Sequence, residues 1–261
     1  MNRTIHCFVP FENEGSARRT IASLRQNKQI GIIYLMSTTS CKDEFEGCPV
    51  IPVKDYTSTE TFSLIAQYAD APYTLLYTKT APLELGYRAM ERMTDFMLPG
   101  TGLVYSDSYE WKDGELKKHP VIDYQWGSVR DDFDFGSLLL FSTRYLKAGL
   151  HLQERRKEDY QFAALYAIRL FIARMGKIVH VNEFLYTEVE EDLRLSGEKQ
   201  FDYVNPRNRN VQIEMEIAFT NYLKDTGAFL KPQFEEPDLK AGHFEMETSV
   251  IIPVKNRVRT I

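Results

Sequence analysis

Cysteine is scarce in this sequence: Cys7, Cys41 and Cys48 are the only three among 261 residues. So small and odd a number excludes a disulfide framework, and the spacings contain no CxxC pair of the kind that binds zinc. We therefore expect the three thiols to act as small apolar side chains in a reducing compartment.

Long apolar runs are also missing. Near the N-terminus, His6, Pro10 and Glu12 interrupt any apolar core of a signal peptide. The most apolar helical stretch, residues 162–172, contains Arg169 and is too short and too charged to span a bilayer. The sequence thus predicts a cytoplasmic protein whose contact with membranes is at most peripheral.

Positive charge is not in excess, since the net charge is −5 and the pI is near 5.7. Nucleic acid is therefore not an expected partner, because affinity for a phosphate backbone depends on clustered Lys and Arg. A Gly-rich phosphate loop after the first apolar run is missing too, which weakens the hypothesis of a plain nucleotide-binding module.

Short apolar runs alternate with helical patterns along the chain. This alternation predicts an α/β fold with a mixed, mostly parallel central sheet and helices on both faces. Strands are expected at residues 5–9, 30–37, 73–78, 102–111, 115–124, 137–142 and 177–186. Helices are expected at about residues 16–26, 61–69, 83–97 and 207–225 and from Glu158 onward.

Local signals refine three of these elements. Thr57 and Glu60 have the spacing of a capping box before the helix at 61–69. Leu85, Ala89, Met93 and Phe96 would share one face of the helix at 83–97. Asp113-Gly114 lies between two extended runs, which favours a hairpin.

The C-terminal segment SVIIPVKNRVRTI, residues 249–261, repeats the pattern of the N-terminal IHCFVPFENEGSARRTI. We therefore predict one domain over residues 1–230, a linker over 231–248 and, from 249 to 261, the first strand and loop of a truncated second domain.

Three stretches carry a resemblance to a known family. They are FVPFENE at residues 8–14, LVYSDSYEWKDGE at 103–115 and KEDYQFAALYAIRLFIARMGKIVHVNEFLY at 157–186. Their order and spacing resemble glycosyltransferase family 2, a family of nucleotide-diphospho-sugar transferases with the GT-A fold. The resemblance implies a nucleotide-sugar donor, a glycan or lipid-linked acceptor and a tandem arrangement in the parent protein.

In such transferases an Asp-x-Asp pair after the fourth strand holds Mn²⁺ or Mg²⁺ against the diphosphate. Here Thr78, Lys79 and Thr80 stand at that place, and YLMSTTS at residues 34–40 lacks the acids usual after the second strand. Hydroxyls and an ammonium do not make a hard-cation site, so we expect no cofactor. Lys79 either contacts a phosphate directly or is a solvated loop lysine.

The resemblance implies further site residues. Glu158 and Asp159 stand where the family carries its general base, although acids there also suit the first turn of a helix. Asp107 is expected to end a strand at the cleft, or to be an ordinary polar strand end.

The loop after the first strand is the remaining expected part of the site. Asn13 and Glu14 would contact a nucleobase, with Phe11 as an apolar wall, although Asn13 also suits an Asx-turn. Asp132 and Asp134 form a literal Asp-x-Asp, but they lie after the hairpin. His6, His119, His151, His180 and His243 show no ligand spacing and are expected to be structural.

Two functions remain open. One is sugar transfer from a nucleotide-sugar donor. The other is a catalytically degenerate domain that binds a glycan or nucleotide, or supports the tandem domain, which the missing acids favour.

Overall fold

The computed structural model describes residues 4–40, 42–112, 114–189 and 209–236. Contacts divide the chain into two units, Met1–Phe229 and Leu230–Ile261. The described part of the second unit, residues 230–236, contains no helix or strand. The predicted second-domain segment at 249–261 lies outside the described residues, so the tandem arrangement stays a prediction.

The first unit is built on one sheet in the order β3-β4-β2-β1-β5-β9-β7-β10-β6, with β8 paired to β7. Its strands are β1 (Ile5–Pro10), β2 (Ile30–Ser37), β3 (Glu44–Phe45), β4 (Cys48–Pro52), β5 (Tyr73–Tyr77), β6 (Glu84–Leu85), β7 (Thr101–Lys112), β8 (Glu115–His119), β9 (Leu138–Ser142) and β10 (Lys177–Val189). The helices are α1 (Glu14–Arg25), α2 (Thr59–Tyr68), α3 (Ala89–Asp95), α4 (Thr143–Arg156), α5 (Ala164–Met175) and α6 (Arg209–Thr226).

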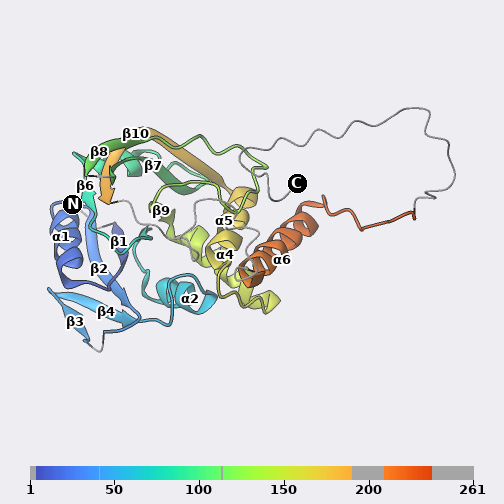
Figure 1. Cartoon of the computed structure of the whole chain (residues 1–261), viewed down its shortest axis with the longest axis horizontal. Coiled ribbons are helices and arrows are strands. Elements are labelled where there is room, and N and C mark those ends of the chain that lie inside the picture. The colour runs from blue at the N-terminus through green and yellow to red at the C-terminus, as the bar shows by residue number, and fades with distance from the viewer. Residues whose placement is uncertain (1–3, 41, 113, 190–208, 237–261) are drawn as a thin grey trace, which may run out of the picture. The chain divides into compact units, whose positions relative to one another are not determined.

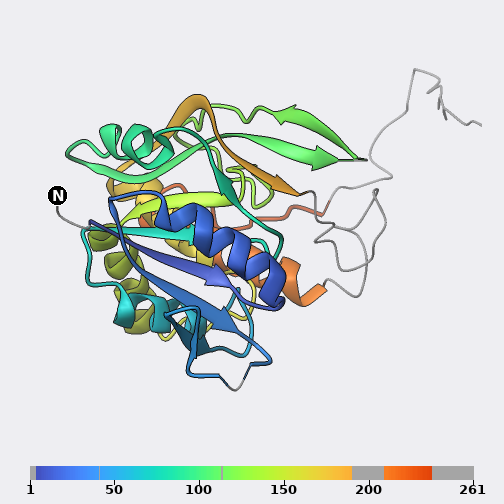
Figure 2. The same ribbon diagram turned by 90° about the vertical axis from the view of Figure 1, so that its left-hand side faces the viewer.

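Helices cover both faces of the sheet (Figure 1). Because strand side chains alternate between faces, neighbours such as Cys7 and Phe8 belong to different cores. One core joins the sheet to α1 and α3, and the other joins it to α2, α4, α5 and α6. Figure 2 shows α1, in blue, lying across the strands of its face. The predicted mixed α/β sheet with helices on both faces is therefore confirmed.

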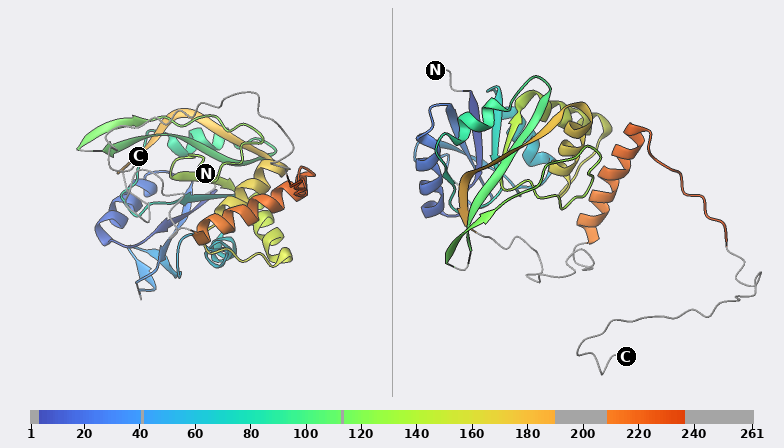
Figure 3. Two further views of the ribbon diagram at one scale, coloured as in Figure 1. Left: turned by 45° about the vertical axis from the view of Figure 1, so that its right-hand side comes forward. Right: turned by 90° about the horizontal axis from the view of Figure 1, so that it is seen from above.

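The strand directions bring many loops to one edge of the sheet. β1 is parallel to β2 and β5, β2 is parallel to β4, and β7 is parallel to β10. β9 runs antiparallel to both β5 and β7, so β5 and β7 share a direction. The carboxyl ends of β1, β2, β4, β5, β7 and β10 consequently lie at one edge, which we call the carboxyl edge. In Figure 3 the long strands β7 and β10 run side by side.

The β7–β8 hairpin is confirmed by the pairing of Lys112 with Glu115. The capping box is wrong by one residue: α2 is capped by Ser58, whose side chain accepts a hydrogen bond from the Thr61 amide. The helix over 83–97 is also shorter than predicted. Leu85 belongs to the short strand β6, where it pairs with Tyr186 of β10. The helix begins only at Ala89, because Arg88 adopts a left-handed conformation with φ of 53°.

The region before α5 differs most from the prediction. A helix that the sequence analysis missed, α4, packs Leu146 and Leu150 into the core, and Lys157 ends it in a left-handed conformation with φ of 55°. Glycine is the usual residue at such a position, so a lysine gives no signal in the sequence. Glu158 therefore lies between two helices, and α5 begins at Ala164.

No helix among the described residues is long and apolar enough to cross a membrane.

Candidate functional site

Several loops at the carboxyl edge are joined by hydrogen bonds. The Val53 amide after β4 donates to the Ser37 carbonyl at the end of β2 (2.9 Å). Glu12, in the loop after β1, accepts from the Thr38 hydroxyl (2.7 Å) and from the Tyr56 hydroxyl. The ends of β1, β2 and β4 thus form one connected rim, where ligands of open α/β sheets usually bind.

The opening loop serves mainly to build α1. Asn13 caps the helix, because its side-chain oxygen accepts from the Ser16 amide (3.1 Å). Glu14, the first helical residue, forms ion pairs with Lys42 and Arg18. Phe11 is 5% exposed and packs against Phe45, with ring centroids 4.9 Å apart. Asn13 and Glu14 remain on the rim, whereas Phe11 belongs to the core.

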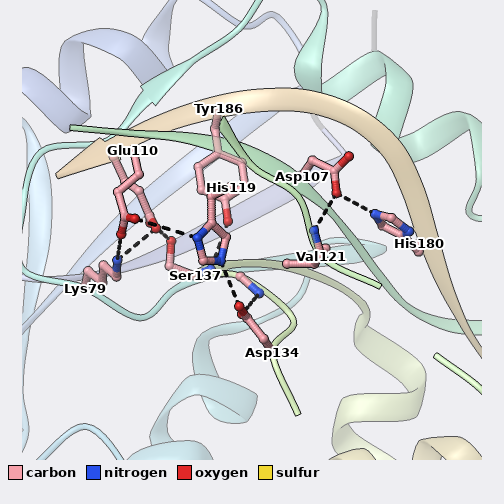
Figure 4. A network of polar contacts seen from close by, with 11 residues as sticks. Lys79, Asp107, Glu110, His119, Val121, Asp134, Ser137, His180 and Tyr186 are labelled. Atoms are coloured by element: carbon pink, nitrogen blue, oxygen red, sulfur yellow. Dashed lines mark hydrogen bonds and ion pairs between the residues drawn. The ribbon is translucent and has the colours of Figure 1, made fainter. Parts of the chain in front are cut away.

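Lys79, just beyond β5, is not a solvated lysine. Its side chain is 12% exposed, and its Nζ lies 2.8 Å from Glu188 Oε1 on β10. Its Nζ also lies 3.6 Å from Glu110 Oε1 on β7 (Figure 4). Both carboxylates are also nearly buried. The solvated-loop interpretation is wrong, because three strands that end at the carboxyl edge enclose this ammonium.

A second ion pair adjoins Lys79. His119, at the end of β8, lies 2.8 Å from Asp134 through Nε2 and 3.7 Å from Glu110 through Nδ1. The hydrogen bond to Asp134 raises the pKa of His119, and the same bond holds the pKa of Asp134 below its usual range. His119 is therefore biased toward its cationic form, which adds a second positive charge beside Lys79.

Glu188 is positioned by the start of β9. Its second oxygen accepts from the Ser137 hydroxyl, and the Ser137 amide donates to the Tyr186 hydroxyl (2.9 Å). Burial raises the pKa of Tyr186 to about 12, so its phenol stays protonated. Gly136 is required here because its φ is +68° and a Cβ would lie 2.3 Å from the Tyr186 hydroxyl. We call Lys79, Glu110, His119, Asp134 and Glu188 the Lys79 cluster.

Thr78 and Thr80 flank Lys79 in the loop after β5. The backbone amide of Thr78 donates to the Ser137 carbonyl (3.0 Å), and its hydroxyl donates to the same oxygen (3.3 Å). Thr80 lies in the next turn of this loop and is half-buried. Thr78 therefore fixes the loop to β9 and leaves Lys79 projecting toward β7 and β10.

The residues after β5 do not fit the divalent cation that the resemblance implies. Thr78 and Thr80 are neutral, and an ammonium occupies the space between the two nearest carboxylates. Within the described ranges no group of three or more His, Cys, Asp and Glu side chains is arranged to hold a metal ion. We therefore derive no step through a metal.

Asp107 does not end a strand. It lies inside β7, is 1% exposed, and its Oδ1 accepts from the Val121 amide (2.9 Å) and lies 2.9 Å from His180 Nε2. His180 also contacts Asp123 (2.7 Å) and stacks on Tyr105 at 5.0 Å. Asp107 thus anchors the loop after β8, beside the Lys79 cluster rather than within it (Figure 4).

The literal Asp-x-Asp at 132–134 splits its two acids. Asp132 pairs with Arg130 (2.7 Å), whereas Asp134 faces His119. Phe133, between them, packs against Phe135 at 4.5 Å. The two carboxylates have separate partners and do not act as one ligand pair.

The expected general-base residues also separate. Glu158 accepts from Asn221 on α6 (2.8 Å) and from the Tyr160 hydroxyl (3.0 Å), so it ties α6 to the loop before α5. Asp159 is exposed. The helix-capping interpretation of this pair is wrong, because α5 begins at Ala164 and receives no side-chain cap. Glu214 on α6 instead accepts from the backbone amides of residues 161, 162 and 163 in the turn before α5.

Sequence analysis missed three members of the cluster: Glu110, Glu188 and His119. Glu110 and Glu188 are acids at strand positions that face inward, and β10 continues three residues past the predicted end at Tyr186. Alternation along β7 and a longer β10 would have shown that both acids point to one face. No local pattern indicates that they meet Lys79.

A cavity lies at the opposite end of the strands. It has a volume of about 810 Å³ and is lined by residues before β1 and β2 and after β6, among them Thr4, Gln29 and Tyr87. This cavity and the Lys79 cluster therefore lie at opposite ends of the strands. We place the candidate site at the carboxyl edge because charged groups converge there.

Comparison with solved structures finds folds similar to this chain at low identity. The mannosyltransferase PcManGT from Pyrobaculum calidifontis, in complex with GDP-Man and Mn²⁺, has 9% identity and a TM-score of 0.48 over 89% of this chain and 66% of that one. This chain thus spans less than two thirds of that protein's length. Mannosyl-3-phosphoglycerate synthase from Rubrobacter xylanophilus has 10% identity and a TM-score of 0.46 over 89% and 78%.

A third similar structure is 2-C-methyl-D-erythritol 4-phosphate cytidylyltransferase from Thermus thermophilus, with 10% identity and a TM-score of 0.42 over 84% of this chain and all of that one. No protein-family profile matches the sequence, and no curated protein matches it.

Proposed function

We propose that this chain is a glycosyltransferase-like domain that binds a nucleotide sugar at its carboxyl edge. In this proposal Lys79 contacts the diphosphate in place of a divalent cation. The observation that carries the proposal is the buried ammonium of Lys79, which lies just beyond β5, where the sequence resemblance expects the diphosphate.

Geometry supports a direct contact between Lys79 and a phosphate. An ammonium has three N–H donors, so it can keep Glu188 at 2.8 Å and turn another donor to a phosphate oxygen. Glu110 is the weaker partner at 3.6 Å, and its other oxygen already faces His119. Replacing the contact to Glu110 therefore costs less than replacing the contact to Glu188.

Sugar transfer to a glycan or lipid-linked acceptor also needs a general base. Of the two acids that the resemblance indicates, Asp159 suits this role better, because it is exposed while Glu158 is engaged by Asn221 and Tyr160. Asp159 is at the carboxyl edge, since the Thr59 amide after β4 donates to the Tyr160 carbonyl (2.8 Å).

A second candidate function is a domain that binds a nucleotide or glycan without turnover, as a module of a tandem protein. The engaged state of Glu158 favours this candidate, because one of the two possible bases is committed to holding α6. Both candidates share the nucleotide site and differ only in the transfer step.

Calorimetric titration with UDP, GDP, CDP and their sugar conjugates tests the shared site. Each ligand is titrated in EDTA and again in Mn²⁺, into the native chain and into Lys79→Met, with Lys54→Met as the control for an exposed lysine. In EDTA we expect the native chain and Lys54→Met to bind and Lys79→Met not to bind, and Mn²⁺ should not strengthen binding by the native chain. Binding by the native chain that requires Mn²⁺, or binding in EDTA that survives Lys79→Met, contradicts the proposal.

Product analysis then separates the two candidates. If the domain transfers sugar, Asp159→Asn abolishes release of the nucleoside diphosphate while the affinity for the donor is unchanged. If the domain only binds, the native chain releases no more nucleoside diphosphate than Asp159→Asn does.

A further inference from the structure

Two carboxylates converge beside the loop after β5, although that loop itself contains no acid at residues 78–80. The residues after β5 are Thr78, Lys79 and Thr80, which alone suggest that ligands for a cation are missing. The fold brings Glu110 from β7 and Glu188 from β10 to this place, because both strands end at the carboxyl edge beside β5. Their oxygens point at one atom, Lys79 Nζ.

We infer that Lys79 occupies a cation site of this fold, and that its ammonium, rather than a lack of ligands, keeps a divalent cation out. Without that ammonium, Glu110 and Glu188 would bind a hard divalent cation, Mg²⁺ or Mn²⁺. This inference deepens the proposed function and rests on it only in assigning the site to a diphosphate. Cation binding after removal of the ammonium does not require a nucleotide.

Charge supports the inference. Glu110 and Glu188 carry two negative charges and are 12% and 4% exposed, while Lys79 supplies one positive charge. His119 faces Glu110 from the other side and is itself paired with Asp134. Without Lys79, two nearly buried carboxylates would face each other across the vacated space, and a divalent cation would balance both.

The ligand chemistry fits as well. Mg²⁺ commonly binds through one or two carboxylates, keeps several waters and adds phosphate oxygens when a nucleotide is present. Glu188 is already oriented by the Ser137 hydroxyl, and Glu110 is fixed by pairing in the β7–β8 ladder. Removing the lysine stem would leave room for the ion and its waters between oriented ligands.

The test is to replace Lys79 by serine, which removes the ammonium and its stem, and to titrate the folded chain with Mn²⁺ alone. The signal of free Mn²⁺ in electron paramagnetic resonance gives the affinity and the number of sites. We expect Lys79→Ser to bind one Mn²⁺ at least about tenfold more tightly than the native chain does. Bound Mn²⁺ should also raise its melting temperature, because the ion binds the folded state.

Three controls assign the site. Lys54→Ser removes an exposed, ion-paired lysine and should gain no Mn²⁺ affinity. Lys79→Met removes the charge but keeps a side chain of similar length in the space, so it should bind more weakly than Lys79→Ser. Adding Glu188→Gln to Lys79→Ser should abolish the gain.

The inference is overturned if folded Lys79→Ser binds Mn²⁺ no better than the native chain, or if the gain survives Glu188→Gln. If Lys79→Ser does not fold in EDTA, the inference requires that Mn²⁺ or Mg²⁺ restore a cooperative unfolding transition. A chain that neither cation restores overturns it too. None of these outcomes depends on nucleotide binding. Failure of the proposed function would instead appear in the nucleotide titrations, so the two failures can be distinguished.

Discussion

Two groups of charged residues in this chain have similar composition and different architecture. The Lys79 cluster takes its members from β7, β8, β10 and the loops after β5 and before β9. Its two glutamates converge on one ammonium at the carboxyl edge. The group around Glu158 joins the loop before α5 to α6, through Asn221, and Arg156 and Arg174 nearby share Asp225. The first group gathers charge at a strand end, whereas the second fastens a helix.

The comparison teaches that acids in a family-like pattern do not by themselves identify a site. Glu158 stands where the resemblance expects a base and instead holds α6 to the loop before α5. Glu110 and Glu188 have no role implied by the resemblance, and both meet Lys79. What distinguishes the groups is the set of elements that supply the partners. If this distinction is correct, substitutions in the two groups should affect different properties.

The largest stability effect is expected for Lys79→Met. Removing one partner of a buried ion pair leaves uncompensated carboxylates, here Glu188 and Glu110, so the free energy of unfolding should fall by about 3–5 kcal/mol. Urea denaturation measures the change. Lys54→Met, at an exposed pair with Glu60, should change it by no more than about 1 kcal/mol. Equal losses in the two variants would show that the Lys79 pair is an ordinary surface pair.

Glu158→Ala should destabilise the fold without affecting nucleotide binding. The substitution leaves Asn221 and the Tyr160 hydroxyl without their acceptor, which costs about 1–3 kcal/mol for partly buried groups. Urea denaturation and calorimetric titration on one preparation give both numbers. Loss of nucleotide affinity at unchanged stability would move Glu158 from the fastening group to the site.

Glu214→Ala should cost about 1 kcal/mol of unfolding free energy, because its carboxylate accepts hydrogen bonds from the backbone amides of residues 161, 162 and 163, just before α5. Glu216, two residues along the same helix and exposed, is the matched control, and Glu216→Ala should have almost no effect. If the two variants unfold at the same urea concentration, the contact of Glu214 with the turn before α5 contributes nothing to stability.

The smallest expected effect is a dependence of stability on pH from His119. Its pKa is raised by Asp134, so its contribution is present below the usual histidine pKa near 6.5 and is lost as the pH rises through the raised value. Both groups are more than a third exposed, and solvent screening limits the effect to at most about 1 kcal/mol. His119→Gln should flatten the stability profile above neutral pH. A profile unchanged by His119→Gln would contradict this assignment.

Strand positions could be predicted because each buried strand is a short apolar run, as in Leu138–Ser142. Helix ends were harder to predict, because Lys157 and Arg88 adopt left-handed conformations that usually favour glycine. Lys79 could be selected from the sequence through its place in the resemblance. The burial of Lys79 could not be predicted, because Glu110 lies 31 positions and Glu188 109 positions away along the chain. Only the order of the strands in the sheet brings them together.

The most direct test of the central claim is to map nucleoside diphosphate binding by amide chemical shifts in EDTA. The account predicts that UDP or GDP shifts the amides of Thr78, Lys79 and Thr80 and of the start of β9, and leaves α6 and the loop at Glu158 unchanged. In Lys79→Met the same nucleotides should shift none of these amides. Shifts confined to the cavity at the opposite end of the strands, or an unaltered map in Lys79→Met, would contradict it.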